Sequence, residues 1–403
     1  MAGATLTTAD SALKEDYQPA IRDQINNSNK LLAQLEKNTK DVECRRAVLS
    51  LHVTRNSGVG FRTEGATLPT AGSQGYAEER VPVKYAYGQI KVSGPVIRAS
   101  KSDKGSFARQ LDAETTGIVR DLKRAVNRAL FGSSDGKVAT CGTTTSSTTV
   151  QLASATTATQ LRQLADIGVI DIGTVASPTT IASARSITAI DTTNKTLTIS
   201  GAAVTTSSSH FIFQSGSGGT GVECTGLQTI IAATGSLYNV DPSTYPVWSS
   251  YVDSNSGSNR TVSDTLFEKA INGIEISSGE EPDLIVTSAG VNRAYAGTLK
   301  SLRRFSNTID LKGGFSVPTV QTGTVEIGLM WDRDCKENTA YIINTKHLTE
   351  YQESDWEFMQ EDGAVLQRAL DGSDAYQATL FKYFDVMTDM RNSHGVIQDI
   401  TEA

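Results

Sequence analysis

The stretch DKGSFARQLDAETTGIVRDLKRAVNRALF, residues 103–131, carries the clearest helical pattern in the chain. Its apolar residues recur at the helical period and form one face, made of Leu111, Ile118, Leu122, Ala125 and Ala129 and widened by Val119, Val126 and Leu130. Asp103 is suited to cap the first turn, and Gly132 is suited to end the helix. At 1.5 Å per residue this helix is about 40 Å long, more than the diameter of a small domain.

Residues 58–96, which precede the helix, predict a long two-stranded excursion. Apolar and polar residues alternate along 81–87, and a shift of phase at Gly88-Gln89 predicts a bulged strand. The segment GVGFRTEGATLPTAGSQGYAEER, residues 58–80, is rich in Gly, Thr and Ala and has few large apolar side chains. An excursion of roughly 40 residues with so little to bury in its own domain favours a binding role.

The first part of the chain, residues 10–43, is polar and helix-prone. Its apolar side chains fall on one stripe, made of Ile21, Ile25, Leu32 and Leu35. One stripe cannot form a core by itself, so we expect this arm to lie on another surface.

A composition change marks a further unit in the middle of the chain. Residues 138–260 hold ten charged residues in 123, whereas the whole chain holds 81 in 403. Thr and Ser replace them, and short alternating runs such as 185–190, 197–200 and 211–213 predict a small antiparallel barrel or sandwich. Residues 191–195 predict the hairpin turn between the first two runs.

Charge returns after this segment, and the pattern becomes mixed. Helices are predicted at 263–278 and 291–299, and strands at 282–287, 325–331, 340–344, 364–369 and 376–387. Strand–helix alternation followed by antiparallel strands indicates the α+β class.

Composition and motifs exclude several functions. With 37 Lys+Arg against 44 Asp+Glu, the net charge of −7 disfavours a protein that coats nucleic acid. The start shows no secretory signal, no run reaches the ~18 apolar residues of a membrane-spanning helix, and the four Cys and four His are scattered without metal-site spacing. The GSGGTG match at 216–221 lacks a following helical period, and Asp332 and Asp334 predict an exposed turn. We therefore expect no enzyme, no metal site and no cofactor.

The order of these elements resembles the major capsid proteins of tailed bacteriophages that share the HK97-type fold. The arm, the excursion and the long helix ending LeuPheGly at 130–132 are similar to the family's N-terminal arm, extended loop (E-loop) and spine helix. The C-terminal succession TrpAspArgAsp 331–334, TyrIleIleAsn 341–344, TrpGluPhe 356–358, GluAspGly 361–363, PheLysTyrPheAspVal 381–386 and HisGlyValIle 394–397 carries the most specific part of the resemblance. The Thr/Ser-rich segment is similar to a small β-barrel insertion found in some members.

The resemblance implies an α+β HK97-type fold with an inserted small β-barrel. Its parts would be the arm at 1–43, the extended loop and flanking strands at 44–100, the spine helix at 101–137, the inserted domain at 138–225, and the peripheral and axial domains at 226–403. The implied intersubunit residues are Ile21, Ile25, Leu32 and Leu35 on the arm and Glu64, Gly65, Pro69, Gly72, Gly75, Tyr76, Lys84 and Tyr85 on the loop.

The function implied is structural: a virion shell of hexamers and pentamers, assembled in the host cytoplasm, that encloses packaged double-stranded DNA without reading its sequence. The implied partners are other copies of the chain, a separate scaffolding protein, a portal, and a decoration protein on the inserted domain. An encapsulin-like nanocompartment stays open as an alternative, because it uses the same fold. A β-rich tail or adhesin component would explain the middle segment, but it would leave the long helix and the arm unexplained.

Overall fold

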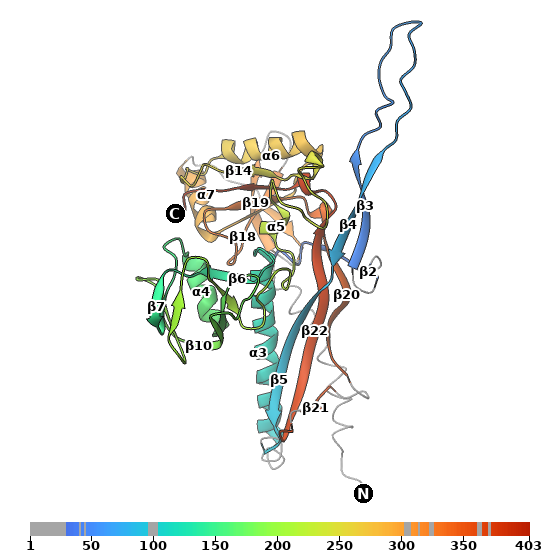
Figure 1. Ribbon diagram of the computed structural model, residues 1–403. Helices are drawn as coiled ribbons and strands as arrows, with labels where there is room; N and C mark the ends of the chain where they lie inside the picture. Colours follow the sequence, from blue (N-terminus) through green and yellow to red (C-terminus); the bar gives the residue numbers. More distant parts are fainter. Residues whose placement is uncertain are drawn as a thin grey trace.

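The computed structural model describes residues 30–39, 42–43, 46–95, 104–301, 308–312, 315–321, 326–360, 365–369 and 372–403. Figure 1 shows an elongated chain, in which a long strand ribbon and helix α3 run side by side and a loop projects beyond one end of the ribbon. Two more compact units lie on the other side of α3. The chain combines helices with mostly antiparallel strands, which confirms the expected mixture of α and β structure.

The ribbon is built on two long strands that are distant in sequence, β5 (Lys84–Ser93) and β22 (Ala375–Thr388). They pair antiparallel over ten residues, from Lys84 opposite Phe384 to Ser93 opposite Ala375, without a register shift. Strand β22 also pairs with β20 (Leu348–Phe358) and with the short β21 (Gln367–Arg368), and β1 (Glu36–Asn38) adds to the far edge of β20.

Helix α3 (Lys104–Leu130) covers one face of this ribbon. Val119, Leu122, Val126 and Ala129 are buried in the main core, and Ile118 packs against its edge. Leu111 belongs to the helix, but its side chain lies outside the described residues. The predicted helix boundaries, 103–131, agree with the structure to within one residue.

The bulge expected at Gly88-Gln89 is wrong, because β5 continues through both residues in register. The alternation of buried and exposed side chains changes phase instead between Val83 and Lys84, where the chain passes from the β3–β4 sheet to the ribbon. A Cβ atom on Gly88 would lie 2.7 Å from Leu122 Cδ1 and 3.0 Å from Ile118 Cδ1. Gly88 therefore allows α3 to approach the ribbon closely.

The projecting hairpin consists of β3 (Arg46–Thr54) and β4 (Gly75–Pro82), with β2 (Val42–Glu43) beside β3. The prediction of a single two-stranded excursion over 58–96 is therefore wrong, because β5 pairs with β22 and not with β4. Both strands alternate apolar and polar residues, and a single period-2 pattern does not reveal which strand is the partner.

One compact unit is a seven-stranded mixed sheet in the order β14-β23-β19-β15-β18-β17-β16. Its strands are β14 (Tyr251–Asp253), β15 (Leu284–Thr287), β16 (Thr308–Leu311), β17 (Phe315–Gln321), β18 (Glu326–Trp331), β19 (Ala340–Ile343) and β23 (Gly395–Ile397). Helices α6 (Asp264–Ser278) and α7 (Ala289–Ser301) accompany it. Ser263 caps α6, and Gly279 ends it in the left-handed conformation with φ 77°. The predicted helices and strands of this region agree closely with these elements.

The second compact unit, here called the inserted segment, runs from β6 to β13 (137–214) in the first part of the low-charge region and has a core of its own. The rest of that region belongs to other units, since β14 joins the seven-stranded sheet and Leu227 and Ile230 lie in the main core. Its six-stranded sheet has the order β6-β13-β9-β10-β11-β8. The strands are β6 (Lys137–Thr140), β8 (Thr149–Gln151), β9 (Val169–Gly173), β10 (Ala182–Asp191), β11 (Thr196–Ile199) and β13 (Phe211–Gln214), with β7 (Thr144–Ser147) and β12 (Val204–Thr206) as a separate pair. The predicted turn at 191–195 is confirmed, because the Asp191 carboxylate accepts the backbone N–H groups of Thr193 and Asn194.

This unit enters and leaves the rest of the chain at one place. Gly219 N donates to Asp135 O at 3.1 Å, and Gly221 N donates to Ser134 O at 3.1 Å. The incoming and outgoing segments are therefore held side by side at the end of α3.

We predict that Gly88→Val lowers the free energy of unfolding by about 1–3 kcal/mol, because the added side chain must displace α3 from the ribbon. The matched control is Gly117→Ala within α3, where a Cβ meets nothing within 4 Å. This control should raise stability by up to about 1 kcal/mol, because alanine is the better helix former. Urea unfolding of both variants checks the pair, and equal stability of Gly88→Val and wild type would contradict it.

Candidate intersubunit surfaces

The loop between β3 and β4, residues 55–74, carries four of the twelve predicted contact residues and extends far from the rest of the chain (Figure 1). Its neck is held by Asn56, whose Nδ2 donates to Gly72 O at 3.0 Å and whose Oδ1 accepts Gly58 N–H at 2.7 Å. A Cβ on Gly58 would lie 2.9 Å from Thr70 O, so glycine allows the two sides of the neck to touch.

The tip beyond this neck exposes three large apolar side chains, Val59, Phe61 and Leu68, all more than four-fifths accessible. Arg62 shapes the tip, since its Nε donates to Thr67 O and its Nη1 to Phe61 O. Isolated exposed apolar residues are ordinary, but three of them on one projecting tip form a surface that a partner can cover.

The predicted loop residues fall in two different places. Glu64, Gly65, Pro69 and Gly72 lie in the loop, and Gly75 and Tyr76 begin β4. Lys84 and Tyr85 instead belong to β5 on the ribbon, where Lys84 Nζ donates to Gly221 O at 2.5 Å. Lys84 therefore contacts the junction with the inserted segment of its own chain.

The ribbon has an aromatic patch, defined as Tyr85, Tyr87, Phe381 and Tyr383. Tyr85 and Tyr87 are half-exposed, and the rings of Tyr85 and Phe381 lie 5.0 Å and 4.9 Å from that of Tyr383. The Tyr87 hydrogen bond, burial and the negative charge of Glu353 raise the pKa of Tyr383 to about 12. The patch is therefore an apolar surface with an acidic neighbour.

The described part of the arm packs into its own chain, contrary to the expectation that its apolar stripe contacts another subunit. Leu32 and Leu35 are buried in the main core of their own chain, so these two side chains are not free for another subunit. Gln34 fixes the same segment, because its Nε2 donates to Lys312 O and its Oε1 accepts Lys312 N–H. Ile21 and Ile25 lie outside the described residues.

The prediction of an exposed turn at Asp332 and Asp334 is wrong, because both side chains are buried. Asn127 Nδ2 on α3 donates to Asp332 Oδ1 at 2.8 Å and to Asp334 Oδ2 at 2.7 Å. Arg162 Nη2 on helix α4 (Ala158–Ile167) donates to Asp334 Oδ1 at 2.5 Å. The two carboxylates thus join α3, the inserted segment and the loop after β18, a role that spacing alone could not reveal.

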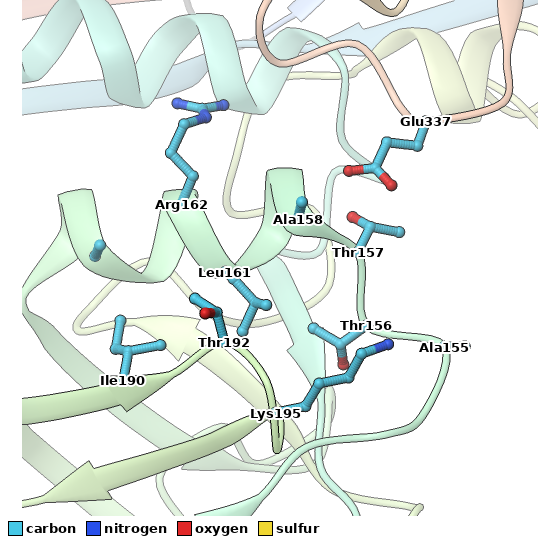
Figure 2. A pocket seen from close by; sticks show the side chains of 11 residues that line it. Ala155, Thr156, Thr157, Ala158, Leu161, Arg162, Ile190, Thr192, Lys195 and Glu337 are labelled. Carbon is cyan, nitrogen blue, oxygen red and sulfur yellow. The ribbon is translucent and has the colours of Figure 1, made fainter. Parts of the chain in front are cut away.

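Figure 2 shows a nearby cavity of about 600 Å³, which is lined by α4 with the segment before it, by the β10–β11 turn and by Glu337. Glu337 reaches the start of α4 from the 332–339 loop, and its Oε1 accepts Thr159 N–H at 2.8 Å. Thr157 caps the helix in a capping box with Gln160. A carboxylate at a helix N-terminus is favourable, so Glu337 helps to fix the orientation of the inserted segment.

A buried carboxyl group lies at the base of the hairpin. Glu79 on β4 has no exposed surface, and neither carboxylate oxygen has a hydrogen-bond partner. Burial, together with the nearby negative charge of Asp389, raises the pKa of Glu79 to about 9. Burial likewise raises the pKa of Asp385 on β22 to about 6, although Thr225 donates two hydrogen bonds to it. No charge pattern in the sequence distinguishes Glu79 from the exposed Glu78 beside it.

Three patterns in the described residues bear on metal sites, nucleotide binding and membrane spans. Among them there is no group of three or more His, Cys, Asp or Glu side chains that could hold a metal ion. The Gly216–Gly221 segment is a loop after β13, and the next helix, α5 (Leu227–Ile230), begins six residues later, so the glycines do not open a helix as a dinucleotide-binding turn requires. No helix in the described part of the chain is long and apolar enough to span a membrane.

Comparison with known proteins gives structural similarities but no sequence match. Neither a protein-family model nor a curated protein matches the sequence. The chain is similar to the capsid asymmetric unit of cyanophage A-1(L), with 15% identity and a TM-score of 0.49, covering 93% of this chain and 94% of that one. It is also similar to a chain from Mycobacterium phage Adephagia, with 12% identity, a TM-score of 0.42 and full coverage of both. The SrpI encapsulin complex of Synechococcus elongatus PCC 7942 shares 8% identity, with a TM-score of 0.45 and coverage of 92% and 86%.

We predict that Glu79 makes stability fall as pH rises between about 4.5 and 9. In that range the folded chain keeps a proton that the unfolded chain releases, so each step upward favours unfolding. Glu79→Gln removes this titration and should flatten the pH profile, as measured by urea unfolding across the range. Glu78→Gln, on the exposed face of the same strand, is the control and should keep the wild-type slope; a wild-type slope in Glu79→Gln would contradict the prediction.

Proposed function

We propose that this chain is a major capsid protein with the HK97-type fold, which self-assembles into a closed shell around double-stranded DNA. The observation that carries the proposal is the projecting loop, whose apolar tip lies beyond the reach of its own chain (Figure 1). In this assignment α3 is the spine helix, the β3–β4 hairpin with its loop is the extended loop, and the seven-stranded unit belongs to the axial domain.

The loop tip and the aromatic patch are complementary surfaces on different parts of the subunit. The tip carries apolar side chains and Arg62, and the patch carries aromatic rings beside the exposed Glu353. A contact between the tip of one copy and the ribbon of the next is heterologous, because it joins two different surfaces. Repeated around an axis, contacts of this kind close into rings, and we assign hexamers and pentamers to this geometry.

The inserted segment would be a small β-barrel displayed from the shell. An isolated antiparallel β-bridge pairs Cys141, which follows edge strand β6, with Leu152, which follows the other edge strand, β8. This backbone pairing supports a closed sheet. Its carboxylate and arginine contacts with α3 and the 332–339 loop favour one fixed orientation. A decoration protein or the host surface would be its partner.

The net charge of −7 suits an enclosing wall better than a nucleic-acid-binding protein. Tight phosphate binding needs clustered Lys and Arg, so this shell would contain DNA without gripping it. The contents of purified particles distinguish the proposal from an encapsulin-like compartment. Nuclease-protected double-stranded DNA supports the capsid, and a cargo enzyme in its place would overturn it.

We predict that a shortened loop abolishes assembly while the subunit still folds. Residues 59–71 are replaced by Asn-Gly, because the backbone at Gly58 already lies beside Gly72 and this pair favours a tight hairpin turn. Circular dichroism should match wild type, whereas electron microscopy should show no closed particles.

The control for this variant is Thr63→Ser, an exposed loop position outside the predicted contact residues, which keeps the loop length and its three apolar tip residues and should assemble normally. Closed particles of wild-type size from the shortened variant would refute the role given to the loop.

A further inference from the structure

A buried lysine lies at the middle of the ribbon, facing two carboxyl groups. Lys382 on β22 has a side chain that is 1% exposed, and its Nζ lies 2.5 Å from Glu350 Oε1 and 3.5 Å from Asp355 Oδ1. Both acidic residues belong to the adjacent strand β20. The rings of Phe384 and Trp356 lie 5.1 Å and 5.8 Å from the same nitrogen and make the surroundings apolar.

Irregular strand pairing brings the two carboxyl groups together. The register of β20 against β22 shifts between Gln352 and Ser354 and again between Ser354 and Glu357. Extra residues on β20 redirect its side chains, so Glu350 and Asp355 both face Lys382 although they are five positions apart. A regular strand would place these two side chains on opposite faces.

The ion pair between Lys382 and Glu350 is costly because both side chains are fully buried. Neither Lys382 Nζ nor either Glu350 carboxylate oxygen makes a hydrogen bond of normal geometry. Removing two charges from water is expensive unless additional hydrogen bonds compensate. Glu350 is placed to take a proton from the lysine nitrogen, and such a transfer would leave a nucleophilic amine beside Asp355.

The Asp355 carboxyl group is held in a way that suits attack by this amine. Its Oδ1 accepts the Trp356 backbone N–H at 2.8 Å, and its Oδ2 lies 3.6 Å from Lys37 Nζ. The backbone N–H donor and the Lys37 charge can stabilise the oxygen that gains charge when the carbonyl carbon is attacked. The side chain is one quarter exposed, so a released water molecule has a short path to solvent.

We propose that Lys382 and Asp355 condense to an internal isopeptide bond, with Glu350 as the proton-transfer group. Glu350 relays one proton from the Lys382 ammonium to the Asp355 carboxylate, and the freed amine attacks Cγ of Asp355. Glu350 then relays a second proton from the nitrogen to the departing hydroxyl. The new N–C bond replaces the C–OH bond, one water molecule leaves, and Glu350 returns to its starting state. No electron transfer is involved, and one positive and one negative charge disappear.

Fixed geometry makes this condensation favourable inside the fold. Reacting groups held in place can reach effective concentrations of about 10⁵–10⁸ M, which offsets the tendency of water to hydrolyse an amide. The bond would close a covalent loop from 355 to 382 and join β20 to β22 independently of their hydrogen bonds. It would therefore constrain the unfolded chain, as other covalent links between distant residues do.

Intact mass spectrometry of the denatured full-length protein tests the proposal. The expected mass is lower than the sequence mass by one water molecule, and proteolysis should yield a branched peptide that joins the segments around Asp355 and Lys382. Lys382→Arg keeps the positive charge but should show the full sequence mass, as should Asp355→Ala. Lys91→Met, on the neighbouring strand β5, is the matched control and should keep the mass deficit.

Glu350→Gln separates a proton-transfer role from mere packing, because glutamine fills the same space but cannot relay a proton in the same way. This variant should show the full sequence mass on a timescale over which wild type has completely reacted. A wild-type mass equal to the sequence mass, with no branched peptide, would overturn the proposal and leave a buried ion pair. This measurement needs no folded variant and no assembled particle, so its result is independent of the capsid assignment.

Discussion

The pairing of β5 with β22, covered by α3 on one face only, is the constraint on which the rest of the subunit depends. The close approach at Gly88 sets how α3 lies on the ribbon. The hairpin projects from the N-terminal end of β5, and the inserted segment begins just after α3 ends. With one face occupied by the helix, the aromatic side chains of the other face remain accessible, and the subunit has a surface that its own chain does not fully cover.

Local periodicity was sufficient to predict the elements but not their partners. The helix at 103–131 repeats every 3.6 residues, so its length and apolar face could be derived without knowing what it covers. The strands around Val83 have the same period whichever neighbour they join, and the change of sheet at that residue resembled a bulge at Gly88. Position 88 needs a glycine because Leu122 packs directly against it. Leu122 lies 34 positions away, so a local sequence pattern does not show this contact.

The features of the candidate surfaces also divide into those that local sequence predicts and those that only the folded chain reveals. The composition of 58–80 indicated a loop with little to bury, and the exposed tip agrees with that inference. Asp332, Glu79 and Lys382 are ordinary charged residues in the sequence, and only the folded chain shows that they are buried. Their surroundings depend on contacts such as Asn127 with Asp332, and on register shifts in β20, which no single segment encodes.

The common entry and exit point of the inserted segment has a practical consequence. Because Ser134 and Asp135 are bonded to Gly221 and Gly219, the 137–214 unit can be treated as a cassette whose replacement leaves the ends of the surrounding chain in place. The exposed β10–β11 turn at Thr192 and Thr193 is then a natural point at which to graft a foreign epitope. In the shell proposed above, such subunits would present one epitope copy each in a regular array, which is the arrangement that vaccine carriers require.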